Sequence, residues 1–298
     1  MDVVISGASG LIGSSLTTSL QADGHRVRRL VRRGVSGGDN IAWDPETGRI
    51  DAPALEAVDA VVNLAGEGIG EQKWTDEQKR RIRDSRVRGT AALAAAAAGR
   101  EQKPRVFISG SAVGYYGNRG DEMLTEQSAP GDDFLGELCQ AWEAETRTAA
   151  DAGVRTVVIR TGLVLAKHGG ALAPLLLPFK LGLGGKQGSG KQWMSWIALV
   201  DEVAAIRAAI DNEQLGGPVN LVAPNAVTNE EFARTLGRVL HRPTLLPTPM
   251  LPLRLRFGAE LVDTLLLSGQ HVTPGVLEAA GFTFRQPVLT GALESIIA

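Results

Sequence analysis

Three glycines that follow an apolar stretch near the start of the chain could bind the phosphates of a nucleotide. The apolar residues 3–5 and Ser6 run into Gly7, Gly10 and Gly13. A strand that turns into a helix without side chains lets a pyrophosphate reach the backbone, where N–H groups of the helix N-terminus can bind it. An ordinary turn without a ligand is the alternative. The residues predicted to hold a dinucleotide here are Gly7, Ser9, Gly10, Leu11, Ile12 and Gly13.

Two arginines after the second predicted strand bear on which dinucleotide binds. The strand ends at Val31, and Arg32 and Arg33 follow it. A carboxylate about 20 residues beyond the glycines would bind the ribose 2′-hydroxyl of NAD, whereas an arginine accommodates a 2′-phosphate. Guanidinium groups bind phosphate through paired charge-assisted hydrogen bonds. The sequence therefore predicts NADP(H), with a solvated basic turn as the alternative.

Small residues after another apolar strand offer a second approach to the cofactor. The residues that follow Asn63 are Leu64, Ala65, Gly66 and Glu67. These residues resemble the N-x-A-G element that passes under the adenosine ribose in short-chain dehydrogenase/reductases, and the resemblance implies that their backbone contacts the nucleotide. The small Ala65 and Gly66 would allow that approach.

A basic stretch in the predicted helix 75–98 supplies one more candidate. Lys79, Arg83 and Arg86 share one helix face by their spacing. Arg86 is the residue that we expect to reach a phosphate, while Arg80 and Arg81 belong to a solvated face.

The elements that must position these residues alternate along the first two thirds of the chain. Apolar strand patterns cover 3–6, 27–31, 60–64, 106–109 and 157–160, and helical patterns cover 11–22, 75–98 and 134–152. Such alternation predicts an α/β fold with a Rossmann-like, doubly wound parallel sheet. We expect a nucleotide-binding domain over 1–162, to which later segments return. A smaller C-terminal α/β lobe would cover 163–298 and include a helical domain at 245–298.

The last third has clear helix and loop signals. Asp201 is predicted to cap a helix over 202–210, and Thr228 with Glu231 predicts a capping box for the helix 229–240. The proline-rich residues 243–252 predict an extended connection, and helices are expected at 275–280 and 293–297.

Composition limits the classes of function. The net charge of −2 favours neither nucleic acid nor an anionic membrane as a partner. Cys139 is the single cysteine and the four histidines lie far apart in sequence, so no disulfide and no metal site are expected. The chain opens with a strand and has no apolar leader or bilayer-spanning run, which predicts a cytoplasmic protein.

Motifs along nearly the whole chain are similar to those of a known protein family. The chain resembles atypical short-chain dehydrogenase/reductases of the nucleoside-diphosphate-sugar epimerase family that carry a C-terminal domain of unknown function. The resemblance implies a Rossmann core, a lobe over the cofactor cleft and NADP(H) binding, but no activity. It rests on residues 7–13, 43–45, 63–67, 85–86, 131–134, 142–143, 160–165, 177–185, 188–190, 196–197, 220–224 and 269–270.

The resemblance also implies a catalytic pattern, and the chain departs from it. The wider superfamily uses a serine, then a tyrosine with a lysine four residues later, to move the hydroxyl proton during hydride transfer. Ser111 matches the serine. The two alignments of the tyrosine–lysine pair place Phe134 and Leu138, or Leu135 and Cys139, at its positions. The usual acid/base pair is therefore absent.

Three functions remain open on these residues. The first is an oxidoreductase in which Tyr115 or Tyr116 replaces the missing acid, although both tyrosines could simply pack at a strand end. The second is a nucleotide-sugar epimerase, and the third is a non-catalytic NADP(H)-binding redox sensor.

The resemblance adds Ser109, Gly110, Gly162 and Val164 to the expected cofactor contacts.

A small-molecule substrate, such as a nucleotide sugar or another carbonyl compound, is the expected partner. The loop 180–196 carries glycines, lysines and two tryptophans that could close over it, or else pack as an ordinary surface lid. The protein is expected to be a monomer or a homodimer. Extended relatives often dimerise through the helices that correspond to 75–98 and 134–152.

Overall fold

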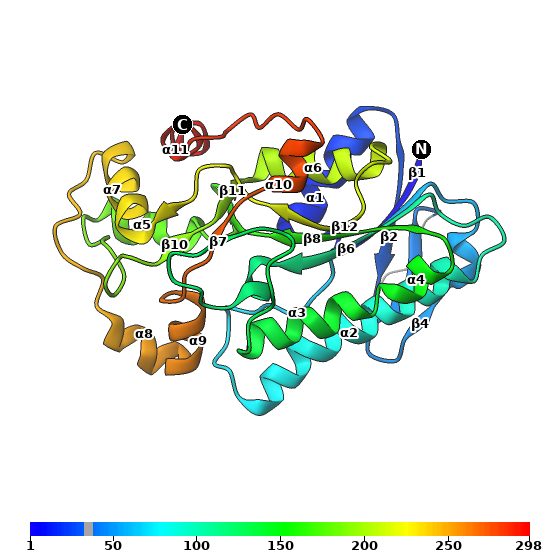
Figure 1. Cartoon of the computed structure of the whole chain (residues 1–298), viewed down its shortest axis with the longest axis horizontal. Helices are drawn as coiled ribbons and strands as arrows, with labels where there is room; N and C mark the ends of the chain where they lie inside the picture. Colours follow the sequence, from blue (N-terminus) through cyan, green and yellow to red (C-terminus); the bar gives the residue numbers. More distant parts are fainter. Residues whose placement is uncertain (33–37) are drawn as a thin grey trace.

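The centre of the fold is one parallel sheet with a single antiparallel edge strand (Figure 1). The computed structural model of the chain describes residues 1–32 and 38–298, and within them the strand order is β12-β8-β6-β5-β1-β2-β3-β4. Because the order reverses on either side of β1, the switch point for a ligand lies between β1 and β5. The strands are β1 (Asp2–Ser6), β2 (Arg26–Val31), β3 (Asn40–Asp44), β4 (Arg49–Ile50), β5 (Ala60–Asn63), β6 (Val106–Ala112), β8 (Arg155–Thr161) and β12 (Gly217–Leu221).

Helices cover both faces of this sheet (Figure 1). One face carries α1 (Leu11–Ala22), α6 (Leu199–Asp211) and α10 (Gly275–Ala279); the other carries α2 (Asp76–Ala98), α3 (Phe134–Ala144) and α4 (Arg147–Asp151). The alternation of strand side chains explains the two layers. Val3 and Ile5 pack with Leu16 of α1, whereas Val4 packs with Leu93 of α2. The α/β fold with a doubly wound parallel sheet is confirmed.

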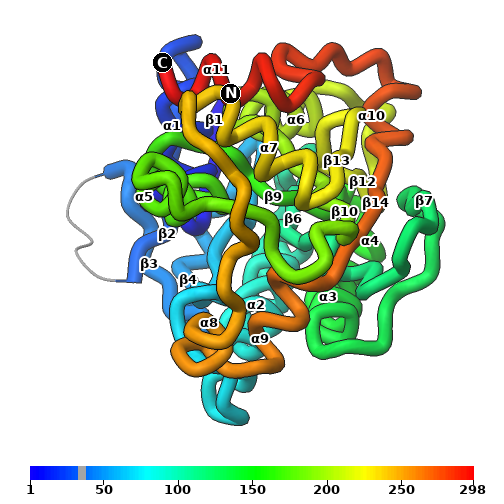
Figure 2. Tube along the Cα trace, turned by 90° about the vertical axis from the view of Figure 1, so that its left-hand side faces the viewer, coloured from blue at the N-terminus to red at the C-terminus, as the bar shows by residue number. Residues whose placement is uncertain are grey.

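A lobe beyond the carboxyl ends of the strands has its own core. Trp196, Phe232, Leu236 and Leu293 are at most 2% exposed and pack together there. Short strands and helices build this lobe, and the chain crosses its outer end between α7 and α8 (Figure 2). They are β9 (Leu163–Leu165), α5 (Ala173–Lys180), β10 (Trp193–Met194), β11 (Trp196–Ala198), β13 (Val227–Thr228), α7 (Asn229–Val239) and α11 (Leu289–Ile297).

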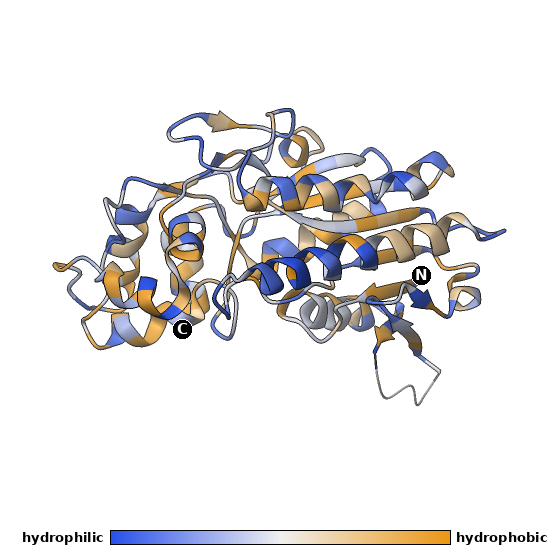
Figure 3. Cartoon of the chain, turned by 90° about the horizontal axis from the view of Figure 1, so that it is seen from below, coloured by the Kyte–Doolittle hydropathy of each residue, from blue (hydrophilic) through white to orange (hydrophobic). Residues whose placement is uncertain are grey.

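The remaining C-terminal elements tie the lobe to the sheet domain. Leu261 and Val262 of α9 pack on Trp74, Ile82 and Leu138, at the start of α2 and in α3. Figure 3 shows α2 as hydrophilic in its first half and apolar in its second, in keeping with its arginine-rich and then alanine-rich sequence. The tying elements are α8 (Met250–Phe257), α9 (Ala259–Leu265) and β14 (His271–Val272), which pairs with β7 (Met123–Leu124); single 3₁₀ turns span Ala52–Leu55 and Val113–Tyr116. No helix in the described ranges is long and apolar enough to cross a membrane.

Most predicted elements are confirmed, some to the residue. Helix α1 has the predicted bounds, α2 is capped by Thr75, and Thr228 and Glu231 form the predicted capping box. The predicted helix 134–152 is wrong in that it is two helices. Thr146 lies at the break, where its buried hydroxyl donates to the carbonyl of Glu143 and competes with helical hydrogen bonding.

Two predictions about the last third are wrong for identifiable reasons. Asp201 does not cap α6, which begins after Ala198. The Asp201 carboxylate instead accepts backbone N–H groups of Arg285 and Gln286, at 2.7 and 2.8 Å. The proline-rich connection ends earlier than predicted, because α8 begins at Met250. Pro252 is tolerated in the first turn of that helix, where no intrahelical N–H bond is needed.

Candidate functional site

The glycine turn between β1 and α1 leaves the helix N-terminus open to a ligand. Gly7 has φ +68°, and a Cβ there would lie 2.8 Å from the carbonyl carbon of Leu64. A Cβ on Gly13 would lie 2.2 Å from the oxygen of Gly7, so the turn and the helix touch through backbone alone. Gly10 is the N-cap, and no side chain caps the helix. Ser9 and Gly10 are exposed. The first-turn N–H groups can therefore serve an anion.

The side chains of two other turn residues face the protein. Leu11 lies against Gly169 and Gly170, within 3.5 Å of where their Cβ atoms would be, and Ile12 packs against the core between the sheet and α6. Any contact of Leu11 or Ile12 with a phosphate therefore comes from the backbone.

A buried hydrogen-bond network, which the sequence did not reveal, holds the turn against the end of β5. Ser6 Oγ donates to Asn63 Oδ1 at 2.6 Å and accepts the N–H groups of Leu64 and Ala65 at 3.1 and 3.2 Å. Asn63 Nδ2 in turn donates to Thr90 Oγ1 at 2.8 Å. The network fixes the predicted contact residues Leu64 and Ala65 beside Gly7. The only sequence signal for it is a polar residue at the end of each apolar strand.

Arg86 lies beneath the loop that contains Gly66 and Glu67. Its Nη1 donates to the carbonyls of Glu67 and Ile82 at 3.0 and 3.2 Å. The guanidinium lies 5.2 Å from the centre of the Trp142 ring, and a Cβ on Gly66 would lie 3.0 Å from its Cζ. Burial lowers the pKa of Arg86. Arg86 therefore supports the loop through the hydrogen bonds of Nη1, and its guanidinium lies beside Gly66, which is exposed.

Of the two arginines after β2, the structure describes Arg32 alone. Arg32 is exposed and directly follows the carboxyl end of β2, the sheet edge that also carries the glycine turn. Arg33 lies outside the described residues.

The end of β6 carries a buried ionic cluster around Ser111. Ser111 Oγ donates to Glu143 Oε1 at 2.6 Å, and Arg160 donates to both oxygens of Glu143, at 2.9 and 2.8 Å. The Arg160 side chain is 3% exposed and that of Glu143 is 13% exposed. Burial acts to lower the pKa of Arg160, but the hydrogen bonds and charge of Glu143 outweigh it and raise that pKa. The proton of the Ser111 hydroxyl is thus directed at a carboxylate.

The two candidate tyrosines both contact Arg160 but differ in their other partners. The Tyr116 hydroxyl donates to Asn220 Oδ1 at 2.6 Å and accepts from Arg160 Nη1 at 3.1 Å. Tyr116 is 0% exposed, and burial raises its pKa to about 12. The Tyr115 ring centre lies 3.4 Å from the Arg160 guanidinium carbon, and Tyr115 is half-buried. Its hydroxyl has no hydrogen-bond partner among the described residues.

Helix α3 places Leu135 and Cys139, rather than Phe134 and Leu138, against the site. The Cys139 thiol lies 3.8 Å from the carbonyl of Ala112, and Leu135 packs against Gly114. Phe134 instead packs on Trp74. Burial raises the pKa of Cys139 to about 12, so the thiol is neutral.

The other expected cofactor contacts are packed closely. A Cβ on Gly110 would lie 2.9 Å from the Trp142 ring, and one on Gly162 would lie 2.5 Å from the oxygen of Ser195. Ser109 is 1% exposed and Val164 is 9% exposed. Ser109, Gly110 and Val164 are thus buried, whereas Gly162 is partly exposed.

The loop 180–196 is held in place by several contacts. Lys186 pairs with Glu230 at 3.3 Å, and Gln192 Nε2 donates to the carbonyl of Leu266 at 2.9 Å. Trp193 stacks on His271, with ring centres 3.9 Å apart, whereas Trp196 is fully buried. Only Trp193 could therefore meet a ligand.

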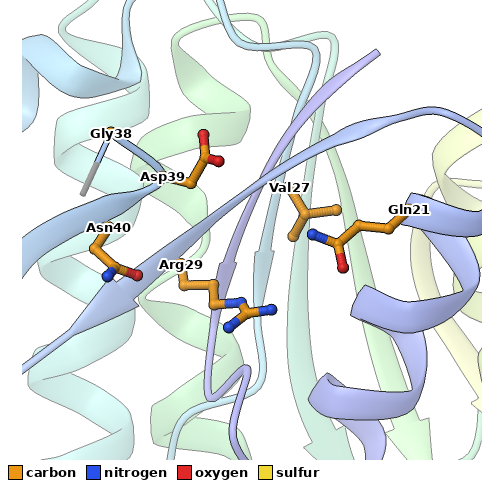
Figure 4. A pocket seen from close by; sticks show the side chains of 6 residues that line it. All are labelled: Gln21, Val27, Arg29, Gly38, Asp39 and Asn40. Atoms are coloured by element: carbon orange, nitrogen blue, oxygen red, sulfur yellow. The ribbon is translucent and has the colours of Figure 1, made fainter. Parts of the chain in front are cut away.

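Two hollows lie along α1, away from the strand ends. The first, of about 260 Å³, lies between α1 and β2 and is lined by Gln21, Val27, Arg29, Gly38, Asp39 and Asn40 (Figure 4). The second, of about 670 Å³, lies between α1 and α6 and is lined in part by Ser19, Val203 and Arg207. Within the described ranges, no group of three or more His, Cys, Asp or Glu side chains could hold a metal ion.

Comparison with known proteins identifies relatives over the whole chain. A model described as "NAD dependent epimerase/dehydratase family" matches residues 3–222, and a "domain of unknown function (DUF1731)" matches residues 248–296. An epimerase family protein of Mycobacterium tuberculosis is 46% identical over 98% of this chain and 96% of its own length.

Two solved structures are similar as well. Human epimerase family protein SDR39U1, crystallised with NADPH, is 37% identical with a TM-score of 0.91, over 99% of each chain. A nucleoside-diphosphate sugar epimerase from Corynebacterium glutamicum is 38% identical with a TM-score of 0.83, over 100% of this chain and 58% of that one. The human structure agrees with the cofactor predicted from the sequence. By these matches, the chain belongs to the NAD dependent epimerase/dehydratase family.

Proposed function

We propose that the protein binds NADP(H) and uses it for oxidation or reduction at a hydroxyl or carbonyl carbon of a small molecule. The observation that carries this proposal is the uncapped N-terminus of α1 behind a turn in which Gly7 and Gly13 admit no side chain, with the exposed Arg32 at the same sheet edge. The human relative solved with NADPH supports the choice of cofactor.

The residues of the cleft fit such a cofactor. The backbone at Gly7, Gly10 and Gly13 would hold the pyrophosphate, since a helix N-terminus without a cap favours an anion there. Arg32 would bind the 2′-phosphate, and Leu64 to Gly66 would lie along the adenosine. We propose that Arg86 supports this last contact from below, because its Nη1 bonds to the carbonyl of Glu67. NADP(H) would supply or accept the hydride.

Tyr115 is the group that we propose to hold or give the proton at the substrate oxygen. Its hydroxyl has no protein partner among the described residues, whereas the hydroxyl of Tyr116 is buried between Asn220 and Arg160. Ser111 would accept a hydrogen bond from a substrate hydroxyl, because its own proton is directed at Glu143, and in that state it offers no donor to a carbonyl oxygen. Tyr116 would then be structural.

The substrate class is proposed as a nucleotide sugar or another carbonyl compound. The Corynebacterium relative carries the description of a nucleoside-diphosphate sugar epimerase, which supports a sugar nucleotide. Arg32 favours NADP(H), and this fits a net reduction better than epimerisation, in which the cofactor is not consumed.

A redox sensor that binds NADP(H) without turnover is the second candidate. Leu135 and Cys139 face the site where the superfamily has tyrosine and lysine, and neither supplies a charged group at neutral pH. This observation favours a protein that reads the reduced or oxidised state of its cofactor.

A monomer in the cytoplasm is the simplest assembly to propose. Among the described residues, the large hydrophobic side chains that are exposed include none on α2 or α3, the helices through which extended relatives dimerise.

One experiment separates the catalytic proposal from the sensor. A panel of carbonyl compounds and nucleotide sugars is offered with NADPH to the wild type and to Tyr115→Phe. We expect turnover of at least one compound and a loss of about 10²- to 10⁴-fold in kcat in the variant, the size typical of a lost acid/base group, with NADPH affinity unchanged. Full activity in Tyr115→Phe would remove Tyr115 from the mechanism. Submicromolar NADPH binding without turnover of any compound would favour the sensor.

A further inference from the structure

The outer end of the lobe carries an unusual concentration of exposed leucines. Ten large hydrophobic residues are exposed among those described, and seven of them lie in residues 177–183 and 245–255. We call these seven the leucine face. Its members are Leu177, Leu181, Leu183, Leu245, Leu246, Leu251 and Leu255, and their exposed fractions run from 64% to 89%. Soluble proteins rarely gather apolar side chains in this way unless something covers them.

The two segments lie against each other because direct contacts join residues 180–186 to residues 242–248. Arg242 Nε donates to the carbonyl of Lys180 at 2.7 Å, and the hydroxyl and N–H of Thr248 donate to the carbonyls of Gly185 and Lys186, at 2.9 and 2.8 Å. Figure 2 looks onto this end of the molecule, where the connection from α7 to α8 runs beside the segment that follows α5. These contacts hold the two segments side by side.

The most exposed point of the face lies between two prolines. Leu245 and Leu246 are 89% and 73% exposed, and Pro243 and Pro247 flank them. On α8, Leu251 and Leu255 point outward one turn apart, while Leu253 and Phe257 pack inward on the core under α9. The exposed leucines are thus surplus to the packing of the lobe.

The charge on the same segments has one sign. Residues 177–186 and 241–257 contain five lysines and arginines and no aspartate or glutamate. Two of these cations pair with acids outside the segments, Lys186 with Glu230 and Arg254 with Asp263. Lys180, Arg242 and Arg256 are exposed without a carboxylate partner among the described residues. The leucine face is locally basic although the chain has a net charge of −2.

From this combination we infer that the leucine face docks on the surface of an anionic lipid bilayer. Leucines that reach the level of the headgroups bury apolar area, and lysines and arginines beside them are attracted to anionic lipid. A second copy of the chain fits less well, because a twofold contact would bring two basic faces together. The inference rests on the exposed leucines and the basic residues beside them, and not on the proposed function.

The test is sedimentation of the intact protein with large unilamellar vesicles of phosphatidylcholine, with and without 30% phosphatidylglycerol (about one lipid in three, enough to make the surface anionic). We expect the wild type to pellet with the anionic vesicles and to stay in solution with the neutral ones. Raising the salt concentration should weaken the binding, because screening reduces the electrostatic part.

The decisive variant is the double substitution Leu245→Glu with Leu246→Glu, matched by Met123→Glu with Val288→Glu, which adds the same charge at exposed apolar sites elsewhere. The first should bind anionic vesicles at least about tenfold more weakly and the second should bind like the wild type, with NADPH affinity unchanged in both. Three results would overturn the inference: no pelleting of the wild type, equal pelleting with neutral vesicles, or full binding by the Leu245 and Leu246 variant. A dimer in solution that this variant dissociates would also overturn it, since the face would then join two copies.

Discussion

At the scale of single residues, the polar groups near Ser111 divide into those already satisfied by the protein and those left open. Glu143 and Arg160 neutralise each other, and between them they direct Ser111 and Tyr116. Tyr115 shares Arg160 with Tyr116 but keeps an unpartnered hydroxyl. Although the two tyrosines are neighbours in the sequence, the buried hydroxyl of Tyr116 is already bonded, whereas the hydroxyl of the half-buried Tyr115 is available to a ligand.

The substitution Tyr116→Phe is predicted to destabilise the fold. It removes a buried hydroxyl that bonds to both Asn220 and Arg160. A buried partner left unsatisfied costs about 1–3 kcal/mol. Tyr115→Phe is the matched control and should change the free energy of unfolding by less than about 0.5 kcal/mol. Urea unfolding of both variants measures the difference, and equal losses would show that the hydroxyl of Tyr116 is not held as described.

Glu202 is predicted to make stability depend on pH. It is 0% exposed, one oxygen accepts from Thr161 at 2.9 Å, and the other has no partner. Burial raises its pKa from 4.5 to about 8. Because the folded state holds this proton more tightly than the unfolded chain does, its contribution is fully present below pH 4.5 and declines as the pH rises toward 8.

The substitution Glu202→Gln should remove that dependence. Between pH 5 and pH 8, the wild type should lose about 1–3 kcal/mol more unfolding free energy than the variant does. The exposed Glu213→Gln is the control and should follow the wild type. Denaturant unfolding at both pH values tests the prediction, and parallel losses in wild type and Glu202→Gln would contradict it.

At the scale of elements, the strand–turn–helix that begins the chain depends on the absence of side chains. We predict that Gly13→Ala weakens NADPH binding at least tenfold, or about 1.4 kcal/mol, because its Cβ would lie 2.2 Å from the oxygen of Gly7 and must displace the turn. Gly216→Ala is the matched control, since a Cβ there meets nothing within 4 Å. Fluorescence titration with NADPH compares the two, and wild-type affinity in Gly13→Ala would show that the turn has room to adjust.

The elements themselves were largely predictable because their signals are local. Short apolar runs predicted the strands, an amphipathic run that ends before Gly24 predicted helix α1, and Thr228 with Glu231 predicted the start of α7. Contacts distant in sequence were not predictable. Asp201 has the sequence position of a helix cap, but its carboxylate accepts hydrogen bonds from the backbone N–H groups of Arg285 and Gln286. The partners of Ser111 and Tyr116 likewise come from α3, β8 and β12. Which tyrosine remains open is a property of the assembled fold.

At the scale of the whole molecule, we propose that the C-terminal segment does not fold as a separate unit. Leu277 of α10 is fully buried in the core between the sheet and α6, while α9 packs on α2 and α3. Leu277→Ala should cost about 2–5 kcal/mol and lower the melting temperature of one common transition. Leu251→Ala, at a side chain that is 69% exposed, should cost little. Circular dichroism and tryptophan fluorescence should melt together, and two separate transitions would contradict this prediction.

The central claim is that the cleft beside the glycine turn binds NADP(H) and that Arg32 selects it over NAD(H). Calorimetric titration of NADPH and NADH into the wild type and Arg32→Ala tests it most directly. We predict tighter binding of NADPH by at least tenfold, about 1.4 kcal/mol, because a guanidinium binds the 2′-phosphate in two places. The variant should lose that preference and keep its affinity for NADH. Equal binding of the two dinucleotides by the wild type, or an unchanged preference in Arg32→Ala, would contradict the account.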